Sequence, residues 1–186
     1  WALSDHEDLT IRPIMMTSEF PVLALQHRLK MRTGEIESET SITDNSTGAF
    51  STEEGKYGIR AHVKAKARFD LNRTWRWGVD LQRAADDTYM RRYGFGSPSS
   101  LDSQLFIEGF TNQNYFTAKT LIFQGLQEDD EQDKSPVIFP LVDFNHVGKR
   151  DRVGGRFIFD GNFLALTRAE GTDTRRLAFH PRWERP

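Results

Sequence analysis

The sequence contains no cysteine among its 186 residues, which excludes disulfide scaffolds, thiol nucleophiles and zinc sites ligated by cysteine. Acidic and basic residues nearly balance, so the net charge of -2 gives no bulk attraction to nucleic acid or anionic lipid. No apolar run approaches the ~20 residues of a transmembrane helix. A mean hydropathy of -0.61 is also low, although a membrane β-barrel hides half of each strand in a polar lumen.

Catalytic and metal-binding motifs are missing as well. The sequence has no HExxH pair, no GxSxG elbow, no Walker loop and no dinucleotide fingerprint. Adjacent acids such as Asp86 and Asp87 fall in expected loops, where acids are usually solvated. The five histidines stand apart on different predicted strands: His6, His27, His62, His146 and His180. We therefore expect that the chain is not an enzyme and holds neither a metal nor a cofactor.

The sequence is rich, instead, in alternation between apolar and polar residues. The stretch YGIRAHVKAKARFD (57–70) is the longest example. One side of an extended chain would carry Tyr57, Ile59, Ala61, Val63, Ala65, Ala67 and Phe69, and the other Arg60, His62, Lys64, Lys66 and Arg68. This period of two predicts a long β-strand that is apolar on one face and basic on the other.

Similar alternation continues along the chain, and no segment shows convincing helical spacing. The predicted strands are 8–17, 22–32, 35–43, 57–69, 74–85, 103–111, 115–126, 137–147, 152–167 and 174–183. The sequence therefore predicts an all-β fold, an antiparallel up-and-down meander of about ten long amphipathic strands.

Long and short connections between these strands alternate along the chain. Long or polar connections are expected at 18–21, 44–56, 86–100, 127–135 and 169–173. Tight turns are expected at 33–34, 70–73, 112–114 and 148–151. In a meander, alternate connections lie at opposite ends of the strands. Long loops at one end and short turns at the other are typical of outer-membrane barrels.

The basic face of such a strand has to meet water. A basic side chain at the midplane of a bilayer costs about 2–4 kcal/mol, so this face would look into an aqueous lumen. The lumen-facing candidates are Arg28, Lys30, Arg60, Lys64, Lys66, Arg68 and Arg76. The solvated face of a soluble β-sandwich would show the same pattern.

Pro13 interrupts the first predicted strand. Proline has no N–H to donate, so in sheets it is confined to edges, strand starts and bulges. Pro13 therefore indicates either an ordinary edge strand or a seam that is deliberately short of hydrogen bonds.

The order and spacing of several segments resemble the barrel of the LptD family, also called organic solvent tolerance proteins (OstA). These proteins assemble lipopolysaccharide in Gram-negative outer membranes. The segments are DLTIRPIMMT, HRLKMRTGEI, WRWGVDLQRAADDTYMRRYGF, LDSQLFIEGFTNQNYF and GGRFIFDGNFLALTRAEGTDTRRLAFHPRWERP. The variant resembles those of alphaproteobacteria.

The resemblance implies a component of lipopolysaccharide transport, without enzymatic activity, in the cell outer membrane. Lipopolysaccharide would arrive from an LptA-type periplasmic bridge through an N-terminal jelly-roll domain. It would leave sideways between the first and last strands, with Pro13 as the proline that loosens this seam. An LptE-like lipoprotein would plug the lumen, and no nucleic acid would bind.

The resemblance also implies that residues 1–186 form a partial barrel domain. It would be the N-terminal part of the barrel, without the jelly-roll domain and the last strands. Two alternatives stay open from the residues themselves. One is a small porin-like channel of about ten strands, and the other is a soluble β-sandwich that binds carbohydrate through Trp75 and Trp77.

Overall fold

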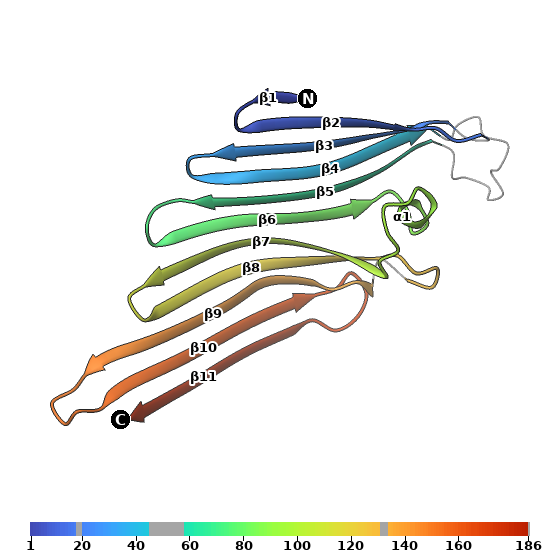
Figure 1. Cartoon of the computed structure of the whole chain (residues 1–186). Helices are drawn as coiled ribbons and strands as arrows, with labels where there is room; N and C mark the ends of the chain where they lie inside the picture. The colour runs from blue at the N-terminus through green and yellow to red at the C-terminus, as the bar shows by residue number, and fades with distance from the viewer. Residues whose placement is uncertain (18–19, 45–57, 131–133, 186) are drawn as a thin grey trace. The chain divides into compact units, whose positions relative to one another are not determined.

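The structure is a computed structural model, which describes residues 1–17, 20–44, 58–130 and 134–185. Its described residues form eleven strands and one short helix (Figure 1). The elements are β1 (Ala2–Ser4), β2 (Glu7–Ile14), β3 (Val22–Met31), β4 (Gly34–Asp44), β5 (Ile59–Asp70), β6 (Trp75–Ala84), α1 (Tyr89–Arg92), β7 (Ser100–Thr111), β8 (Asn114–Gly125), β9 (Val137–Arg150), β10 (Arg156–Thr167) and β11 (Thr174–Glu184).

The strands follow one another in a single antiparallel order, from β1 to β11, without a crossover. This order confirms the predicted all-β meander. It also differs from a β-sandwich, in which two separate sheets pack face to face. β1 was not predicted, and Tyr57 and most of the expected loop at 44–56 lie outside the described residues. In the described part of the chain, no helix is long and apolar enough to cross a membrane.

The chain divides into two compact units. The first unit consists of Trp1–Ala67, Asp80–Ser103 and Gln124–Asp130, and the second of Arg68–Val79, Gln104–Phe123 and Glu131–Pro186. β5, β6, β7 and β8 are each divided between the units, whereas β1 to β4 belong to the first and β9 to β11 to the second.

In the first unit, strand register separates a polar from an apolar face. Arg28 of β3 stands opposite Asp8 of β2 and Glu37 of β4, so these charged side chains share one face. Leu23 stands opposite Pro13 and Ile42 on the other face. Ile11, Leu23, Met31 and Ile42 leave two fifths or more of their surface exposed there. Exposed apolar side chains along several strands are typical of a surface that meets lipid or a partner.

The second unit shows the same separation on β8 to β11. Asp143 of β9 stands opposite Thr117 and Asn162, and Asp160 stands opposite Asn145 and His180, on the polar face. The apolar face carries a row of aromatic rings. Phe144 lies opposite Phe116, and the rings of Phe159 and Phe179 stack with centroids 5.5 Å apart. A register shift at Phe139 and Pro140 marks a β-bulge, where proline's missing N–H interrupts no regular pairing.

Three of the four predicted tight turns lie where the sequence placed them, and the fourth is displaced. Asn112 adopts a positive φ of 56° in the two-residue turn between β7 and β8, a conformation that asparagine tolerates. The turn predicted at 148–151 lies instead at 151–155, because β9 continues to Arg150. The Asp151 carboxylate accepts the N–H groups of Val153 and Gly155 and so closes the turn. The strand predicted to start at 152 therefore starts at Arg156.

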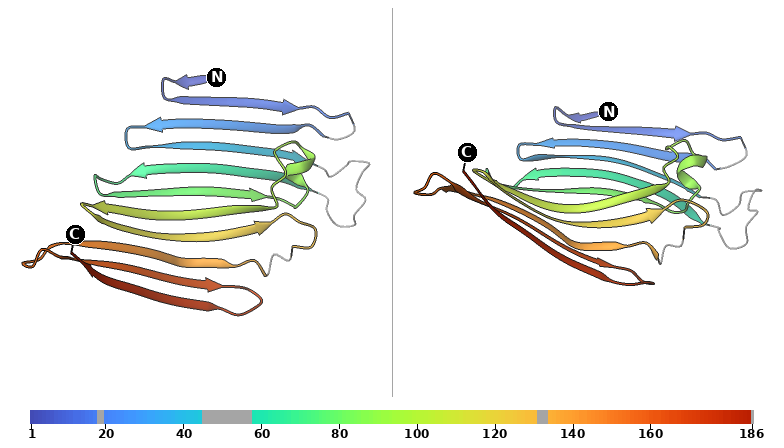
Figure 2. Two further views of the ribbon diagram at one scale, coloured as in Figure 1. Left: turned by 60° about the horizontal axis from the view of Figure 1, so that its bottom comes forward. Right: turned by 90° about the horizontal axis from the view of Figure 1, so that it is seen from below.

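The helix α1 is a feature that the alternation pattern did not predict. It is a single turn within the connection between β6 and β7. The connection folds back over one face of the first unit (Figure 2). Its apolar side chains form the buried core of that unit together with strand residues. The buried members are Val22, Ala24, Ala84, Tyr89, Met90, Tyr93, Phe95, Leu101 and Leu126.

Candidate functional site

The α1 segment, defined here as residues 85–99, packs on the polar face of the first unit. Tyr89 and Met90 are fully buried there beside Val22 and Ala24 of β3. Ala24 stands opposite Ser41 in the register of β3 and β4, on the face that carries Arg28 and Glu37. The α1 segment therefore covers the polar face at the end of the strands where β3 begins.

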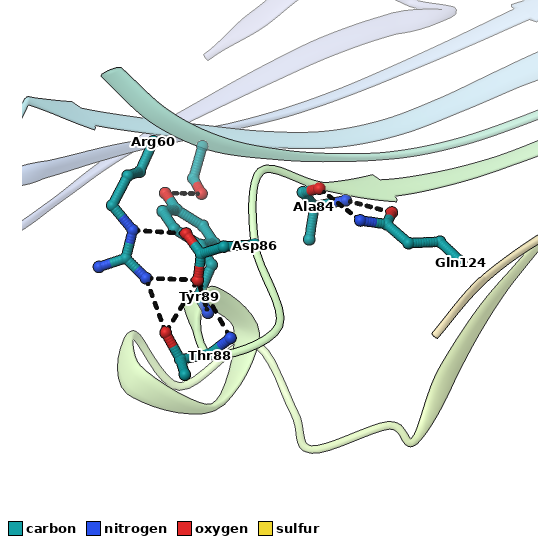
Figure 3. A network of polar contacts seen from close by, with 7 residues as sticks. Arg60, Ala84, Asp86, Thr88, Tyr89 and Gln124 are labelled. Carbon is teal, nitrogen blue, oxygen red and sulfur yellow. Dashed lines mark hydrogen bonds and ion pairs between the residues drawn. The ribbon is translucent and has the colours of Figure 1, made fainter. Parts of the chain in front are cut away.

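An ion pair between Arg60 and Asp86 ties the α1 segment to β5 (Figure 3). Arg60 donates from Nε to Asp86 Oδ2 at 2.6 Å and from Nη2 to Asp86 Oδ1 at 2.7 Å. Nη2 also donates to the Thr88 hydroxyl at 3.0 Å. The two charged side chains are only 14% and 17% exposed. Two parallel bonds from a guanidinium to a carboxylate fix both the distance and the orientation of the partners.

Asp86 also organises the start of α1. Its Oδ1 accepts the backbone N–H groups of Thr88 and Tyr89 and the Thr88 hydroxyl. Burial would raise the pKa of the Asp86 carboxyl, but the bonds from Arg60 and Thr88 outweigh it and hold the pKa below its ordinary value. The carboxylate is therefore charged at neutral pH, and its charge is matched by Arg60.

A buried polar chain lies beneath the α1 segment. Ser41 Oγ lies 2.5 Å from His62 Nδ1 and 2.7 Å from the Tyr89 hydroxyl. His62 Nε2 lies 3.5 Å from a carboxylate oxygen of Glu39, an ion-pair distance at which the geometry makes no hydrogen bond. The His62 ring packs against Phe95, with centroids 4.2 Å apart.

This chain has the residue types of a Ser-His-acid triad, but its setting is structural. A nucleophilic serine has to reach a substrate. Ser41 is 3% exposed, and its Oγ is engaged by both His62 and Tyr89. These bonds therefore satisfy the buried Ser41 and Tyr89 hydroxyls and His62 Nδ1 between β4, β5 and α1, but not His62 Nε2.

Two side chains complete the backbone hydrogen bonding of β6. The Gln124 amide accepts from Ala84 N at 3.1 Å and donates to Ala84 O at 2.7 Å (Figure 3). Ser103 does the same for Gln82, at 3.0 Å in each direction. These bonds hold the end of β6 where the chain turns into the α1 segment.

Most of the seven predicted lumen-facing cations have partners within the protein. Arg28 binds Asp8 through both carboxylate oxygens, and Lys64 Nζ donates to Phe95 O at 3.2 Å. In the second unit, Arg68 donates to Val79 O and lies over the Phe106 ring, and Arg76 pairs with Asp70 at 3.0 Å. Together with Arg60, five of the seven are thus engaged.

The remaining two candidates are Lys30 and Lys66. Lys30 stands opposite Glu35 in the strand register, and Lys66 is exposed on β5. Neither side-chain ammonium has an ion-pair or hydrogen-bond partner among the residues that the structure describes. Of the seven candidates, they have the most freedom to meet a ligand on the polar face.

Sequence reasoning missed Asp86, Ser41 and Tyr89. It assigned Asp86 to solvent because it lies in a loop, and this expectation is wrong, because the loop folds back on the sheet. The aromatic and apolar content of TYMRRYGF was the available signal, since a solvated loop has little use for buried tyrosine and methionine. In the described ranges, no group of three or more acidic or histidine side chains is arranged to hold a metal ion.

Residues 58–186 match the family model LptD, described as LPS transport system D. The matched range starts just before β5 and includes the α1 segment and all later strands. No curated protein matches the chain.

Proposed function

Because the chain belongs to the LptD family, whose members serve lipopolysaccharide transport at the outer membrane, we propose that it forms part of the wall of the translocating barrel. The polar face of its strands lines an aqueous lumen, and the apolar face meets lipid. Residues 1–186 are then the N-terminal part of a larger barrel domain.

The observation that carries this proposal is the separation of a polar from an apolar face, which is present in β2 to β4, before the matched range, and in β8 to β11, within it. Charged side chains such as Arg28 and Glu37 gather on one face, and exposed Leu23 and Ile42 on the other. A basic side chain facing lipid at the bilayer midplane costs about 2–4 kcal/mol, so the charged face has to be the wet one. Lipopolysaccharide is amphipathic and suits a path with both kinds of surface.

The internal ion pairs refine the predicted set of lumen contacts. Arg28, Arg60 and Arg76 are matched by carboxylates, so their charge is largely neutralised before any lipopolysaccharide arrives. Lys30 and Lys66 are then the best-placed cations for phosphate groups in the lumen. Arg60 acts instead as an anchor for the α1 segment, which narrows the lumen at its loop end.

The lateral seam lies at the edge of β2. Trp1 O accepts the Leu9 N–H, and the backbone nitrogen of Trp1 donates to Leu9 O, so odd-numbered residues of β2 direct their N–H away from β3. Pro13 follows Leu9 by four residues and so falls on this same edge. β1 pairs only with Glu7 and Asp8 and does not reach Pro13. A closing strand would lack a hydrogen bond at that point.

The proposal includes partners outside this chain. An LptE-like lipoprotein would fill the part of the lumen that the α1 segment leaves open. An LptA-type bridge would deliver lipopolysaccharide through an N-terminal jelly-roll domain. Neither activity as an enzyme nor a cofactor is part of the proposal.

Site-specific photocrosslinking in cells tests the assignment of the faces. A photoreactive residue replaces Lys66 on the polar face or, as the matched control, its neighbour Ala65 on the apolar face. We expect lipopolysaccharide adducts at position 66 that disappear within minutes when the periplasmic supply of lipopolysaccharide is stopped. Adducts at position 65 should persist, because they report the bulk outer leaflet.

The opposite result would refute the proposal. If position 66 gives no adducts while transport continues, or adducts that persist after the supply stops, then the polar face is not on the path. Surface delivery of lipopolysaccharide, measured in the same cells, shows that each variant still functions.

A further inference from the structure

A pocket opens on the polar face of the second unit, far along the chain from the α1 segment. Its volume is about 310 Å³, and its lining comes from β8, β9, β10 and β11. The polar residues that line it are Tyr115, Asp143, Asn145, Asp160, Asn162 and His180. Register places these side chains on one face, so their polar groups converge on the same space.

The pocket exists because a small residue stands among larger ones. Ala178 of β11 lies opposite Asn162 of β10, whereas its neighbour on the same face, His180, lies opposite Asp160. A methyl group at this position leaves the ends of the planar side chains uncovered. Tyr115 of β8, opposite Asn145, supplies an aromatic ring at the other side.

The floor is an alternating array of amides and carboxylates. Asn145 Nδ2 donates to Asp160 Oδ1 at 2.5 Å, and Asn162 Nδ2 donates to Asp143 Oδ1 at 2.6 Å. The two amide oxygens, the second Asn145 hydrogen and the second Asp143 oxygen stay available for other partners. Asn162 Nδ2 also donates to Val142 O at 3.5 Å, and Asp160 Oδ2 lies 3.9 Å from His180 Nδ1. These bonds also fix the side chains in place, so a ligand would meet groups that are already oriented.

The charge of the pocket selects against anions. Two carboxylates face the space. The His180 ring lies in the lining, 3.9 Å from Asp160, and Arg182 lies outside the lining, 4.0 Å from Asp160. Phosphate groups would be repelled. The pocket also lacks the ligands for a metal ion, since no group of three acidic or histidine side chains is arranged to hold one within the described residues.

We propose that this pocket binds an uncharged, hydroxyl-rich sugar unit. Sugar hydroxyls both donate and accept, which matches the mixed acceptors and donors of the array, and the Tyr115 ring offers an apolar surface for a sugar face. The inference rests on the proposed function, in which the sugar portion of lipopolysaccharide passes along this face. It assigns sugars to β8 to β11, while phosphates meet Lys30 and Lys66.

The test measures binding of a defined probe to the detergent-solubilised protein. The probe is core oligosaccharide freed of lipid and of phosphate, and saturation-transfer NMR gives its affinity. Ala178→Leu fills the hollow without removing a polar group and should weaken binding by about tenfold or more. Ala165→Leu, on the opposite face of β10, adds the same bulk and should leave the affinity unchanged.

A second measurement needs no variant. Titration of the probe should shift the side-chain amide signals of Asn145 and Asn162 in the unmodified protein, with no comparable shift at Gln124. Absence of probe binding, or equal binding by Ala178→Leu, would overturn the inference. Calcium binding at these amides without sugar binding would overturn it as well.

The inference and the proposed function fail in different ways. If lipopolysaccharide reaches the cell surface but the probe does not bind, the pocket assignment is wrong and the transport function stands. If the probe binds but position 66 gives no transient lipopolysaccharide adducts, the pocket stands and the route through the polar face is wrong.

Discussion

At the scale of single residues, Arg60 illustrates what alternation predicts and what it misses. A period of two in residues 57–70 needs only the local sequence, so it assigned Arg60 to the same face as Lys64 and Lys66. The partner of Arg60 is Asp86, 26 residues further along the chain. That pairing depends on the path of the α1 segment, which no local periodicity encodes.

The Arg60–Asp86 pair is expected to matter for stability more than a surface pair. Arg60→Ala leaves a mostly buried carboxylate without its partner, and we expect the free energy of unfolding to fall by about 2–3 kcal/mol. Urea unfolding of the folded protein in detergent, followed by tryptophan fluorescence, measures the loss. Arg28→Ala is the matched control, because its pair with Asp8 is largely exposed and should contribute less than about 1 kcal/mol.

Exchange of the two charges separates the ion pair from the arginine's packing. Arg60→Asp combined with Asp86→Arg should recover part of the stability that either single reversal loses. Equal losses in Arg60→Ala and Arg28→Ala, or no recovery in the double variant, would show that the pair does not hold the α1 segment.

At the scale of elements, the sequence predicted ten of the eleven strands, most of them to within a few residues. Alternation is enough to locate a strand where one face is apolar, because a shift of the strand's register by one residue would turn every apolar side chain to the polar face. It failed at the start of β10, where the Asp151 side chain builds a turn out of residues assigned to a strand. It also failed at α1, which is too short to show a helical period.

Pro13 leaves the edge of β2 short of one hydrogen-bond donor. Pro13→Ala restores an N–H at the uncovered edge and so adds one hydrogen bond, about 0.5–1.5 kcal/mol, to a closed seam. We expect newly made lipopolysaccharide to reach the cell surface about 2- to 10-fold more slowly, as measured by pulse labelling. Pro140→Ala, at the bulge of β9, is the control and should not slow release; an equal rate for Pro13→Ala and the unmodified protein would exclude a role in the seam.

At the scale of the whole molecule, the two faces of the sheet are expected to respond differently to the same charge. Ala65→Arg places a cation on the apolar face of β5 and should destabilise the folded protein in lipid vesicles by about 2–4 kcal/mol. Gln26→Arg adds the same side chain to the polar face of β3, opposite Glu39, and should change the stability of the folded protein by less than about 1 kcal/mol.

Denaturant titration of both variants in vesicles makes the comparison. Similar costs for Ala65→Arg and Gln26→Arg would mean that the apolar face does not meet hydrocarbon. The outcome concerns the whole wall, because the same separation of faces runs through β2 to β4 and β8 to β11.

The burial of the α1 segment has a consequence for how the protein can diversify. Loops that run over a protein surface usually vary among homologues, because a change there disturbs few contacts. Residues 85–99 are the exception, since Tyr89 and Met90 are fully buried and Asp86 is bound by Arg60. The α1 segment is therefore expected to resist sequence drift, which makes it a dependable target for a ligand meant to recognise many strains.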